Sequence, residues 1–393
     1  MSMSSFFITN AKVVTLQGVI EQGCVRIENG TIVFVGTQAE APAADLATWQ
    51  QDAVDAKGGW VIPGFIDVHV HGGYGADFMD SSKEVLDTIT KFHLSQGTTT
   101  IHATTMTQSH DAIERVLAEV YEYMNQPMPY AQVHGVHMEG PFINPKYKGA
   151  QNPAYMIEAR VDWLDAWNTK YPGVIKQISL APERNGAIPA IEWARANGIN
   201  VAAAHTDATY DEIETAVEAG LNQAVHTYNA MTPLTHRAPG TVGAVLSDDR
   251  IIAELIADGI HVHPAAMKVL VKCKNNNNLV VITDAMSAAG LGDGEYDLGG
   301  LPVIAKNGEA RLKDGGSLAG SLLTMIQAFK NMVNMVGCSV PEAVLLTSYN
   351  AAKQLRIEDR TGSIGVGKQA DILLLDADLN LQSIWVKGNQ AKN

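Results

Sequence analysis

Histidines and carboxylates stand directly after several apolar runs of the chain, in positions where they could bind a metal ion. His69 and His71 end the first of these runs and lie two residues apart. Residues at this spacing on a strand point to the same side, so both rings can reach one ion. The other candidate metal ligands and the candidate acid/base each end a different run: Glu139, His205, His226 and Asp284. Such groups rarely gather without a function, whereas an isolated His-x-His pair is weak evidence.

The ligand types indicate hydrolytic metal chemistry. Imidazole nitrogens and carboxylate oxygens suit Zn²⁺, Fe²⁺, Mn²⁺ or Co²⁺. Glu139 has two oxygens with which to bridge, so the group could hold one divalent ion or two. A bound ion lowers the pKa of a water molecule to about 7 and polarises a carbonyl, which suits hydrolysis of an unreactive amide. Asp284 would then be the general base that accepts the proton of the water and passes it to the departing amine.

Structural interpretations of these residues stay open at this point. Asp284 could cap a helix after the last strand, because aspartate is a favoured N-cap residue. Glu139 could be a surface carboxylate that stabilises the turn Glu139–Phe142. We interpret His137 as a buried, structural histidine, because neutral buried histidines are common. Three further histidines receive no role from the sequence, although His263, before Pro264, is expected to end a loop: His102, His134 and His263.

The elements that must position these residues alternate between apolar runs and helical patterns, which is typical of βα units and a parallel sheet. Eight strands are expected, at Val61–Val70, Thr98–Thr104, Gln132–Met138, Val174–Leu180, Asn200–Ala204, Gln223–Thr227, Ile251–Ile256 and Leu279–Ile282. Eight such strands over roughly 250 residues predict a closed (β/α)8 TIM barrel, and the candidate residues stand on its carboxyl face. An open doubly wound sheet is the alternative, but no Gly-x-Gly-x-x-Gly turn follows the first strand.

Capping patterns predict several of the intervening helices. The segments Ser81–Glu84 and Thr209–Glu212 both read as capping boxes ahead of apolar helical positions. Gly97 and Gly220 stand where these two helices should stop. A third helix should follow Ser109, with an apolar face formed by Ile113, Val116, Leu117 and Val120.

Short apolar runs separated by turns occupy both ends of the chain. Asn29-Gly30 between two such runs is a strong hairpin signal. We therefore expect a small β-sandwich domain built from residues 1–60 and 355–393, with the catalytic barrel over residues 61–354. The glycine-rich segment Gly290–Gly316 reads as an insertion after the eighth strand, either a lid or an annex to the small domain.

Charge and cysteine content exclude several classes of protein. The chain has 28 basic and 42 acidic residues and a net charge of −14, which disfavours binding of nucleic acid or an anionic membrane. A phosphate on a substrate would therefore need locally placed cations. The cysteines, Cys24, Cys273 and Cys338, are few and far apart, and we interpret them as reduced thiols. Because Met1–Leu16 shows no signal-peptide pattern, we expect a cytoplasmic protein.

Six ordered motifs carry a resemblance to a known family. They are Gly64–Gly73 (GFIDVHVHGG), Met138–Phe142 (MEGPF), Ala203–Asp207 (AAHTD), His226–Met231 (HTYNAM), Ile256–His261 (IADGIH) and Thr283–Met286 (TDAM). Together with Gly367–Ile372 (GKQADI) near the end, they span nearly the whole chain. The sequence resembles the N-acetylglucosamine-6-phosphate deacetylases of the amidohydrolase superfamily.

The resemblance implies a function and a set of site residues. Glu139, His205 and His226 would bind the principal metal ion, and Asp284 would be the catalytic acid/base. The substrate-binding residues implied are Ala150, Gln151, Asn229, Ala230, Asp258, Gly259, Ile260, His261, Leu318, Ala319, Gly320 and Arg237. Arg237 matches a phosphate-binding arginine that reaches across from the second subunit of a homodimer, which would supply a local cation. The reaction implied is hydrolysis of the acetamide of N-acetyl-D-glucosamine 6-phosphate.

The chain also departs from some relatives. It keeps His69 and His71, which some members lack, so up to two ions per subunit are expected. Gln151 stands where some relatives have histidine. No lysine ends a middle strand to serve as a carbamylated metal bridge. The alternatives are the same reaction on N-acetyl-D-galactosamine 6-phosphate, another cyclic-amide hydrolase or deaminase on this barrel, and an inactive barrel that serves as a binding module.

Overall fold

A computed structural model describes residues 5–41 and 53–391 of the chain. Residues 1–4, 42–52 and 392–393, which belong to the expected terminal domain, lie outside the described residues. Within the described ranges, no helix is long and apolar enough to span a bilayer.

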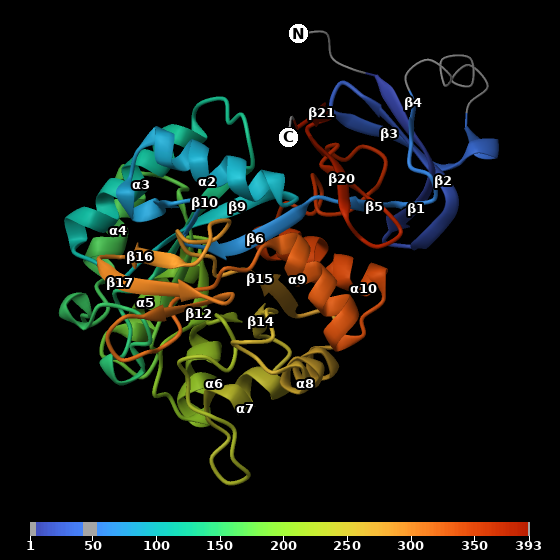
Figure 1. The fold of residues 1–393 in the computed structure, drawn as a ribbon. Coiled ribbons are helices and arrows are strands. Elements are labelled where there is room, and N and C mark those ends of the chain that lie inside the picture. The colour runs from blue at the N-terminus through green and yellow to red at the C-terminus, as the bar shows by residue number, and fades with distance from the viewer. Residues whose placement is uncertain (1–4, 42–52, 392–393) are drawn as a thin grey trace.

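The central feature is a barrel of parallel strands (Figure 1). The described part of the chain contributes eight strands to it, in the spatial order β15-β14-β13-β12-β11-β10-β9-β6. The barrel closes after β15, where Val70 and Ala285 form a parallel bridge and the Asp284 amide donates to the His69 carbonyl at 2.9 Å. The strands are β6 (Phe65–Val70), β9 (Thr98–Thr105), β10 (Gln132–Glu139), β11 (Ile175–Leu180), β12 (Asn200–Ala203), β13 (Gln223–Ala224), β14 (Ile252–Ile256) and β15 (Leu279–Ile282). The TIM-barrel fold predicted from the apolar runs is confirmed.

The first predicted run is divided between two sheets. β5 (Trp60–Pro63) pairs with β1 and β19 of the terminal sheet, and only β6 belongs to the barrel. Gly64 separates the two strands, and a Cβ atom there would lie 2.2 Å from the hydroxyl oxygen of Thr99. A glycine is therefore required where the chain passes tightly from one sheet to the other.

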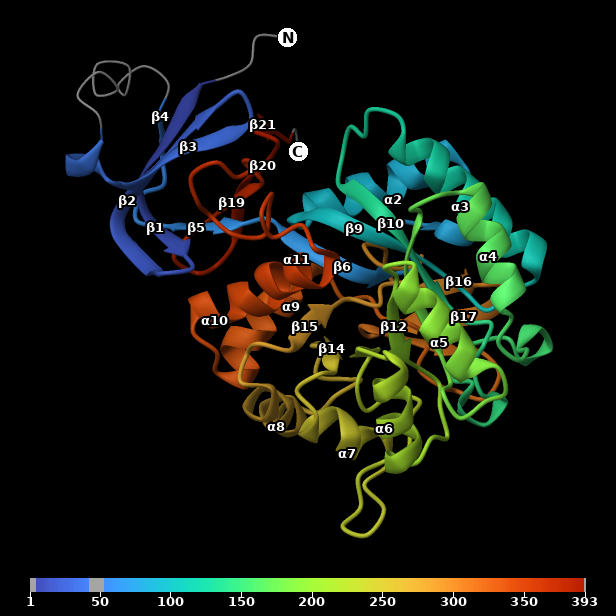
Figure 2. The ribbon, with the colours of Figure 1, turned by 180° about the vertical axis from the view of Figure 1, so that it is seen from behind.

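Helices surround the barrel (Figures 1 and 2). They are α2 (Lys83–Ser95), α3 (His110–Met124), α4 (Val161–Lys170), α5 (Ala187–Ala196), α6 (Tyr210–Ala219), α7 (Gly240–Ser247), α8 (Pro264–Lys274), α9 (Met325–Asn331), α10 (Val340–Val344) and α11 (Asn350–Leu355). The helix after Ser109 buries the four apolar residues expected of its face. Thr209 and Glu212 form the expected capping box of α6, and Gly220 ends this helix in the left-handed conformation.

One predicted cap is displaced by a residue. Ser82, rather than Ser81, caps α2, and its hydroxyl accepts from the amide of Val85 at 3.3 Å. Ser81 instead ends the short helix η2 (Phe78–Asp80) with φ of 50°. Two adjacent serines could each serve as the cap, and the path of the preceding turn decides between them.

The chain ends meet in one further sheet. It contains β1 (Phe6–Thr15), β2 (Gly18–Glu28), β3 (Thr31–Thr37), β4 (Ala53–Asp55), β5, β19 (Ile372–Leu375), β20 (Leu381–Val386) and β21 (Asn389–Gln390). The turn at Asn29-Gly30 joins β2 to β3 with φ of 52° and 80°, which is the hairpin that the sequence predicts. This terminal sheet has its own apolar core, which includes Ile8, Val25 and Ile372.

The glycine-rich insertion forms a small antiparallel sheet of β16 (Gly294–Leu298), β17 (Leu301–Lys306) and β18 (Glu309–Leu312). Leu298 and Val303 pack with Met106 and Met286 of the barrel loops. Figure 1 shows this sheet against the barrel and well apart from the terminal sheet. Of the two possibilities left open by the sequence, an annex to the small domain is therefore wrong.

Candidate active site

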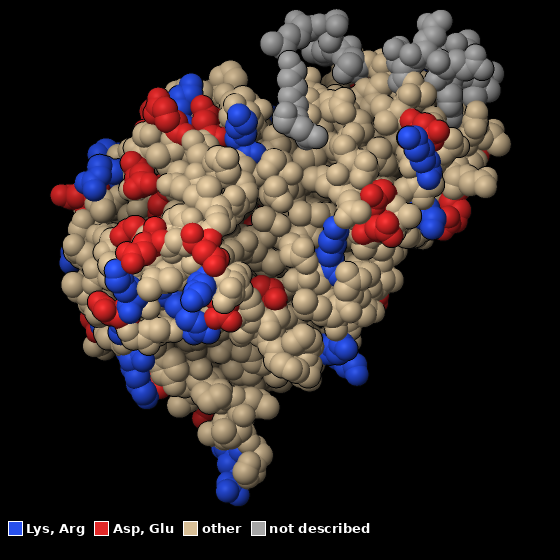
Figure 3. Space-filling view, in the orientation of Figure 1, with Lys and Arg blue, Asp and Glu red and all other residues tan. Residues whose placement is uncertain are grey.

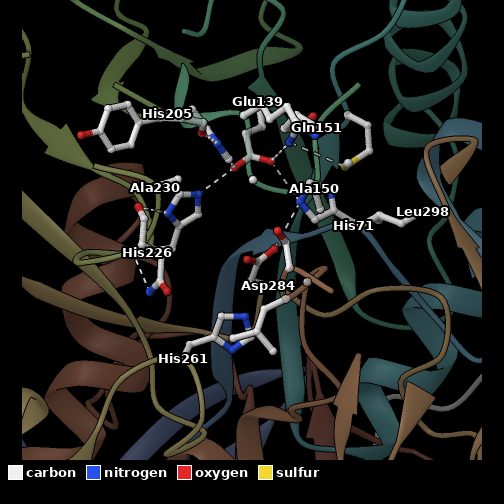
Figure 4. A pocket seen from close by; sticks show the side chains of 18 of the residues that line it. His71, Glu139, Ala150, Gln151, His205, His226, Ala230, His261, Asp284 and Leu298 are labelled. Atoms are coloured by element: carbon white, nitrogen blue, oxygen red, sulfur yellow. Dashed lines mark hydrogen bonds and ion pairs between the residues drawn. The ribbon is translucent and has the colours of Figure 1, made fainter. Parts of the chain in front are cut away.

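Glu139 is the centre of a cluster at the carboxyl mouth of the barrel (Figure 4). It ends β10 and is only 2% exposed, so it is not a surface carboxylate. Its Oε1 atom lies 3.3 Å from His205 Nε2 and 3.0 Å from His226 Nε2. Glu139 ends β10, and His205 and His226 follow the ends of β12 and β13. Together the three residues form one group that could hold a metal ion.

A second group lies on the other side of Glu139. His71 Nε2 is 3.2 Å from both Glu139 Oε2 and Asp284 Oδ1. His69 Nε2 is 3.5 Å from Glu139 Oε1 and 3.6 Å from Asp284 Oδ1. His69, His71 and Asp284 therefore form a second potential metal group, and the Glu139 carboxylate faces both groups. All the metal candidates chosen from the sequence come together here.

Three of these residues have a left-handed backbone. His205, His226 and Asp284 have φ of 44°, 28° and 51°. Residues with a side chain rarely adopt such angles, and strained positions of this kind cluster at active sites. Each of the three stands two residues beyond the end of its strand, β12, β13 or β15, and its side chain lines the pocket at the mouth of the barrel. Asp284 does not begin a helix, so its interpretation as a helix cap is wrong.

Charges within the cluster shift the pKa values of its members. Burial alone raises the pKa of Glu139, but the surrounding imidazoles hold it well below its usual range. Burial also raises the pKa of Asp284, yet His69 and His71 bring the net shift below the ordinary value. Burial lowers the pKa of His69, whereas Asp284 and Glu139 raise it to about 9. Both carboxylates are therefore ionised at neutral pH, where they pair with the imidazoles around them.

The cluster forms the floor of a pocket of about 620 Å³, a size typical of small-molecule sites. Its wall includes seven of the substrate-binding residues suggested by the sequence: Ala150, Gln151, Asn229, Ala230, His261, Leu318 and Gly320. Gln151 accepts from the amide of Thr107 at 2.8 Å and donates to Glu139 Oε2 at 2.5 Å. The amide of Gln151 therefore holds the central carboxylate in place.

Comparison with known proteins agrees with this arrangement. The model of the amidohydrolase family matches residues 60–393, which include the whole barrel. The chain belongs to the amidohydrolase family. Members of this family depend on metal ions, which fits the two groups of potential ligands.

Two relatives that match nearly the whole chain are both named as deacetylases of an acetylated amino-sugar phosphate. The chain is 39% identical to N-acetylglucosamine-6-phosphate deacetylase of Bacillus subtilis (strain 168), over 98% of this chain and 97% of the relative. It is 37% identical to N-acetylgalactosamine-6-phosphate deacetylase of Escherichia coli O157:H7, over 97% of each. A solved structure of N-acetyl-D-glucosamine-6-phosphate deacetylase from Mycobacterium smegmatis, in complex with N-acetyl-D-glucosamine-6-phosphate, has a TM-score of 0.92 and 30% identity, covering 98% of this chain and 99% of that one.

Other expected substrate contacts of this amidohydrolase lie outside the pocket wall. Asp258 holds His261 instead, with its Oδ2 2.6 Å from His261 Nδ1. Ala319 is fully buried in the core beneath the insertion. Gly259 and Ile260 form the turn that Asp258 stabilises, where the amide of Ile260 donates to Asp258 Oδ1 at 2.8 Å. Asp258, Gly259 and Ile260 therefore lie beside His261 and not in the pocket wall.

Arg237 lies on an arm between β13 and α7, and the exposed residues of this arm, 233–238, project from the barrel (Figure 1). Among the described residues it lines a separate hollow with Asp207 and Thr209, not the pocket over Glu139. A role for Arg237 at a sugar phosphate therefore requires a second subunit.

Three basic side chains in the pocket wall of the amidohydrolase were not predicted from the sequence. They are Lys146, Lys148 and Arg311. The lysines stand in the loop directly after Glu139, a position that could have suggested them. Arg311 comes from the insertion, whose place the sequence did not predict. Figure 3 shows acidic and basic side chains interspersed over the visible face.

The remaining histidines have structural surroundings. His137 is fully buried, with its Nε2 atom 2.6 Å from the hydroxyl of Ser179. His102 stacks on His134 below the cluster, at a ring distance of 5.8 Å. His263 caps α8 by accepting from the amide of Ala265.

Proposed function

We propose that this amidohydrolase hydrolyses the acetamide of N-acetyl-D-glucosamine 6-phosphate to D-glucosamine 6-phosphate and acetate, with the help of divalent metal ions. The observation that carries the proposal is the cluster at the floor of the pocket. Four histidines lie within 3.5 Å of Glu139, and Asp284 lies within 3.6 Å of two of them. The names of the similar full-length relatives supply the substrate.

The residues of the cluster fit a metal ion. His69 Nε2 is buried and has no hydrogen-bond partner among the described residues, although it points at two carboxylates. Separations of 3.0–3.6 Å between the candidate ligand atoms agree with the roughly 3.3 Å expected between ligands of a tetrahedral ion with bonds of about 2.0–2.1 Å. Glu139, His205 and His226 would hold the principal ion, and His69 and His71 a second one.

Zn²⁺ or Fe²⁺ suits these nitrogen and oxygen ligands best, and Mn²⁺ or Co²⁺ is also compatible with them. An ion held there would supply polarisation of the acetamide carbonyl and acidify a water molecule. Asp284, ionised at neutral pH and exposed to the pocket, is placed to take a proton from the attacking water. The protonated Asp284 then returns the proton to the nitrogen of the departing sugar amine.

The pocket wall accounts for a phosphorylated sugar. Lys148 brings positive charge to the pocket wall. Lys146 and Arg311 also line the wall, where they pair with Asp207 and Glu309 at 2.7 Å. His261, held by Asp258, offers its Nε2 atom to the pocket. Arg237 would add a cation from the neighbouring subunit of a homodimer. The enzyme would act in the cytoplasm, which fits three free cysteines.

The same reaction on N-acetyl-D-galactosamine 6-phosphate is the second candidate, because one relative of 37% identity is named for it. The two sugars differ at one hydroxyl. A buried hydrogen bond to that hydroxyl can discriminate strongly between them. N-acetylglucosamine is favoured because the relative of 39% identity and the solved neighbour both carry that name.

One substrate panel tests the proposal. The metal-loaded protein is incubated with N-acetylglucosamine 6-phosphate, N-acetylgalactosamine 6-phosphate and unphosphorylated N-acetylglucosamine, and release of acetate and free amine is followed. We expect the highest kcat/KM with the first compound. An equal kcat/KM with the unphosphorylated sugar would refute the proposal that the pocket recognises a phosphate. A higher kcat/KM with N-acetylgalactosamine 6-phosphate would make that compound the substrate.

A further inference from the structure

One carboxylate inside the barrel has no role in the chemistry described so far. Glu254 is on β14 and is completely buried. Its only ion-pair partner among the described residues is His69, whose Nδ1 lies 2.9 Å from Glu254 Oε2. Burial of a carboxylate is costly unless donors surround it. Its presence at this depth therefore calls for an explanation other than core packing.

A series of hydrogen bonds determines which atom is the donor in the contact between His69 and Glu254. Gln354 Nε2 donates to Gln177 Oε1 at 2.9 Å, so Gln177 presents its amide nitrogen to Glu254. Gln177 Nε2 donates to Glu254 Oε1, also at 2.9 Å. A carboxylate only accepts hydrogen bonds, so His69 must donate its Nδ1 proton to Oε2.

This hydrogen bond also determines the state of Nε2, the other nitrogen of the His69 ring. With the proton on Nδ1, the lone pair of a neutral His69 is on Nε2, and this atom faces Glu139 and Asp284. The other histidines of the cluster have no carboxylate next to Nδ1. His205 and His226 direct Nδ1 at the backbone carbonyls of Tyr147 and Asn229, and His71 Nδ1 has no hydrogen-bond partner among the described residues.

We infer that Glu254 is a positioning residue that, supported by Gln177, fixes the tautomer and the ring orientation of His69 and so makes the His69, His71 and Asp284 group able to bind a second ion. The inference rests on the proposed metal-dependent function and adds a residue to it. Carboxylates behind metal-binding histidines typically change metal affinity 10–100-fold when they are removed.

The first test is the affinity of each ion in Glu254→Gln. This variant keeps the size of the side chain but turns one oxygen into a donor. We expect the second zinc ion to bind roughly 10–100-fold more weakly, while the ion at Glu139, His205 and His226 is unaffected. Metal titration of the purified protein measures both affinities. Gln223→Met is the matched control, because Gln223 is equally buried and bonds to Gln354 but not to Glu254. It should bind both ions like the wild type.

A second measurement does not depend on activity or on the folding of Glu254→Gln. Proton NMR of the zinc-loaded wild type should show a downfield, slowly exchanging imidazole N–H, which disappears in His69→Gln. Its absence in the wild type would overturn the inference, as would wild-type affinity for both ions in Glu254→Gln. A wild type that binds only one zinc ion would also overturn it, whereas acetate release from the sugar phosphate would still support the proposed function.

Discussion

Glu139 belongs to the first group of potential metal ligands and faces the second, but the histidines of the two groups are held in place by different means. In the first group, backbone carbonyls of the adjoining loops hold the His205 and His226 rings. In the second group, the buried side chain of Glu254 holds His69, and His71 has no comparable support. A backbone carbonyl survives any substitution, whereas a side chain does not. The first group is therefore built to persist, and the second group can be tuned or lost by changes elsewhere in the barrel.

Glu139→Gln should have the largest effect, because this residue faces both groups. Loss of the shared carboxylate weakens both proposed ion sites, and several kcal/mol of transition-state stabilisation corresponds to a fall in turnover of roughly 10³-fold or more. Metal analysis and acetate release measure the two effects. The exposed cap variant Glu212→Gln is the control. If Glu139→Gln still binds two ions per subunit, the Glu139 carboxylate does not contribute to both ion sites.

Asp284→Asn should lower turnover by roughly 10²–10⁴-fold, the usual contribution of a positioned acid/base. Asparagine keeps the shape of the side chain but cannot take the proton. The ion held by Glu139, His205 and His226 should remain, which metal analysis of the variant checks. Near wild-type turnover would show that Asp284 is not the base.

Joint replacement of His69 by Gln and of His71 by Asn should have a smaller effect on turnover. We expect the metal content to fall from two ions to about one per subunit, because three protein ligands and water suffice for a catalytic site. Activity should fall but survive. Metal analysis after reconstitution of both proteins decides the matter. A count of one ion in the wild type as well would leave the second group without a metal.

These expectations show which parts of the site the sequence could predict. The residues of the cluster were predictable because side chains at the carboxyl ends of barrel strands face the mouth of the barrel. They are His69, His71, Glu139, His205, His226 and Asp284. Glu254 also left a signal, a single charge inside the apolar run Ile251–Ile256. Its partner His69 is 185 residues away, so no local pattern could have connected them.

The fold was predictable to a similar extent. Apolar runs and caps gave the barrel strands and the helices α3 and α6 closely. The division at Gly64 was not predictable, because it depends on a close approach to Thr99. The place of the insertion depends on packing of Leu298 against Met106, a contact between distant segments.

Arg237→Ala should have the smallest effect on turnover, because it lies outside both ligand groups. We expect KM for the sugar phosphate to rise far more than kcat falls, since a phosphate contact remote from the amide contributes mostly uniform binding. Steady-state kinetics with the phosphorylated sugar measure the split. A fall confined to kcat would place Arg237 in the chemistry instead.

Mixing Arg237→Ala subunits with Asp284→Asn subunits tests whether the arm reaches a neighbouring site. If it does, each heterodimer contains one site with both defects and one with neither, and activity recovers on mixing. Mixtures that are no more active than the average of the two variants would indicate that each subunit uses its own arginine.

The most direct test of the account follows acetate release from N-acetylglucosamine 6-phosphate as divalent metal is added back to the metal-free protein. Metal-free protein should be inactive, and activity should rise with the first ion per subunit, the one assigned to Glu139, His205 and His226. A second ion should raise it further. Full activity in the rigorously metal-free protein would contradict the claim that the cluster at the barrel mouth is a catalytic metal centre.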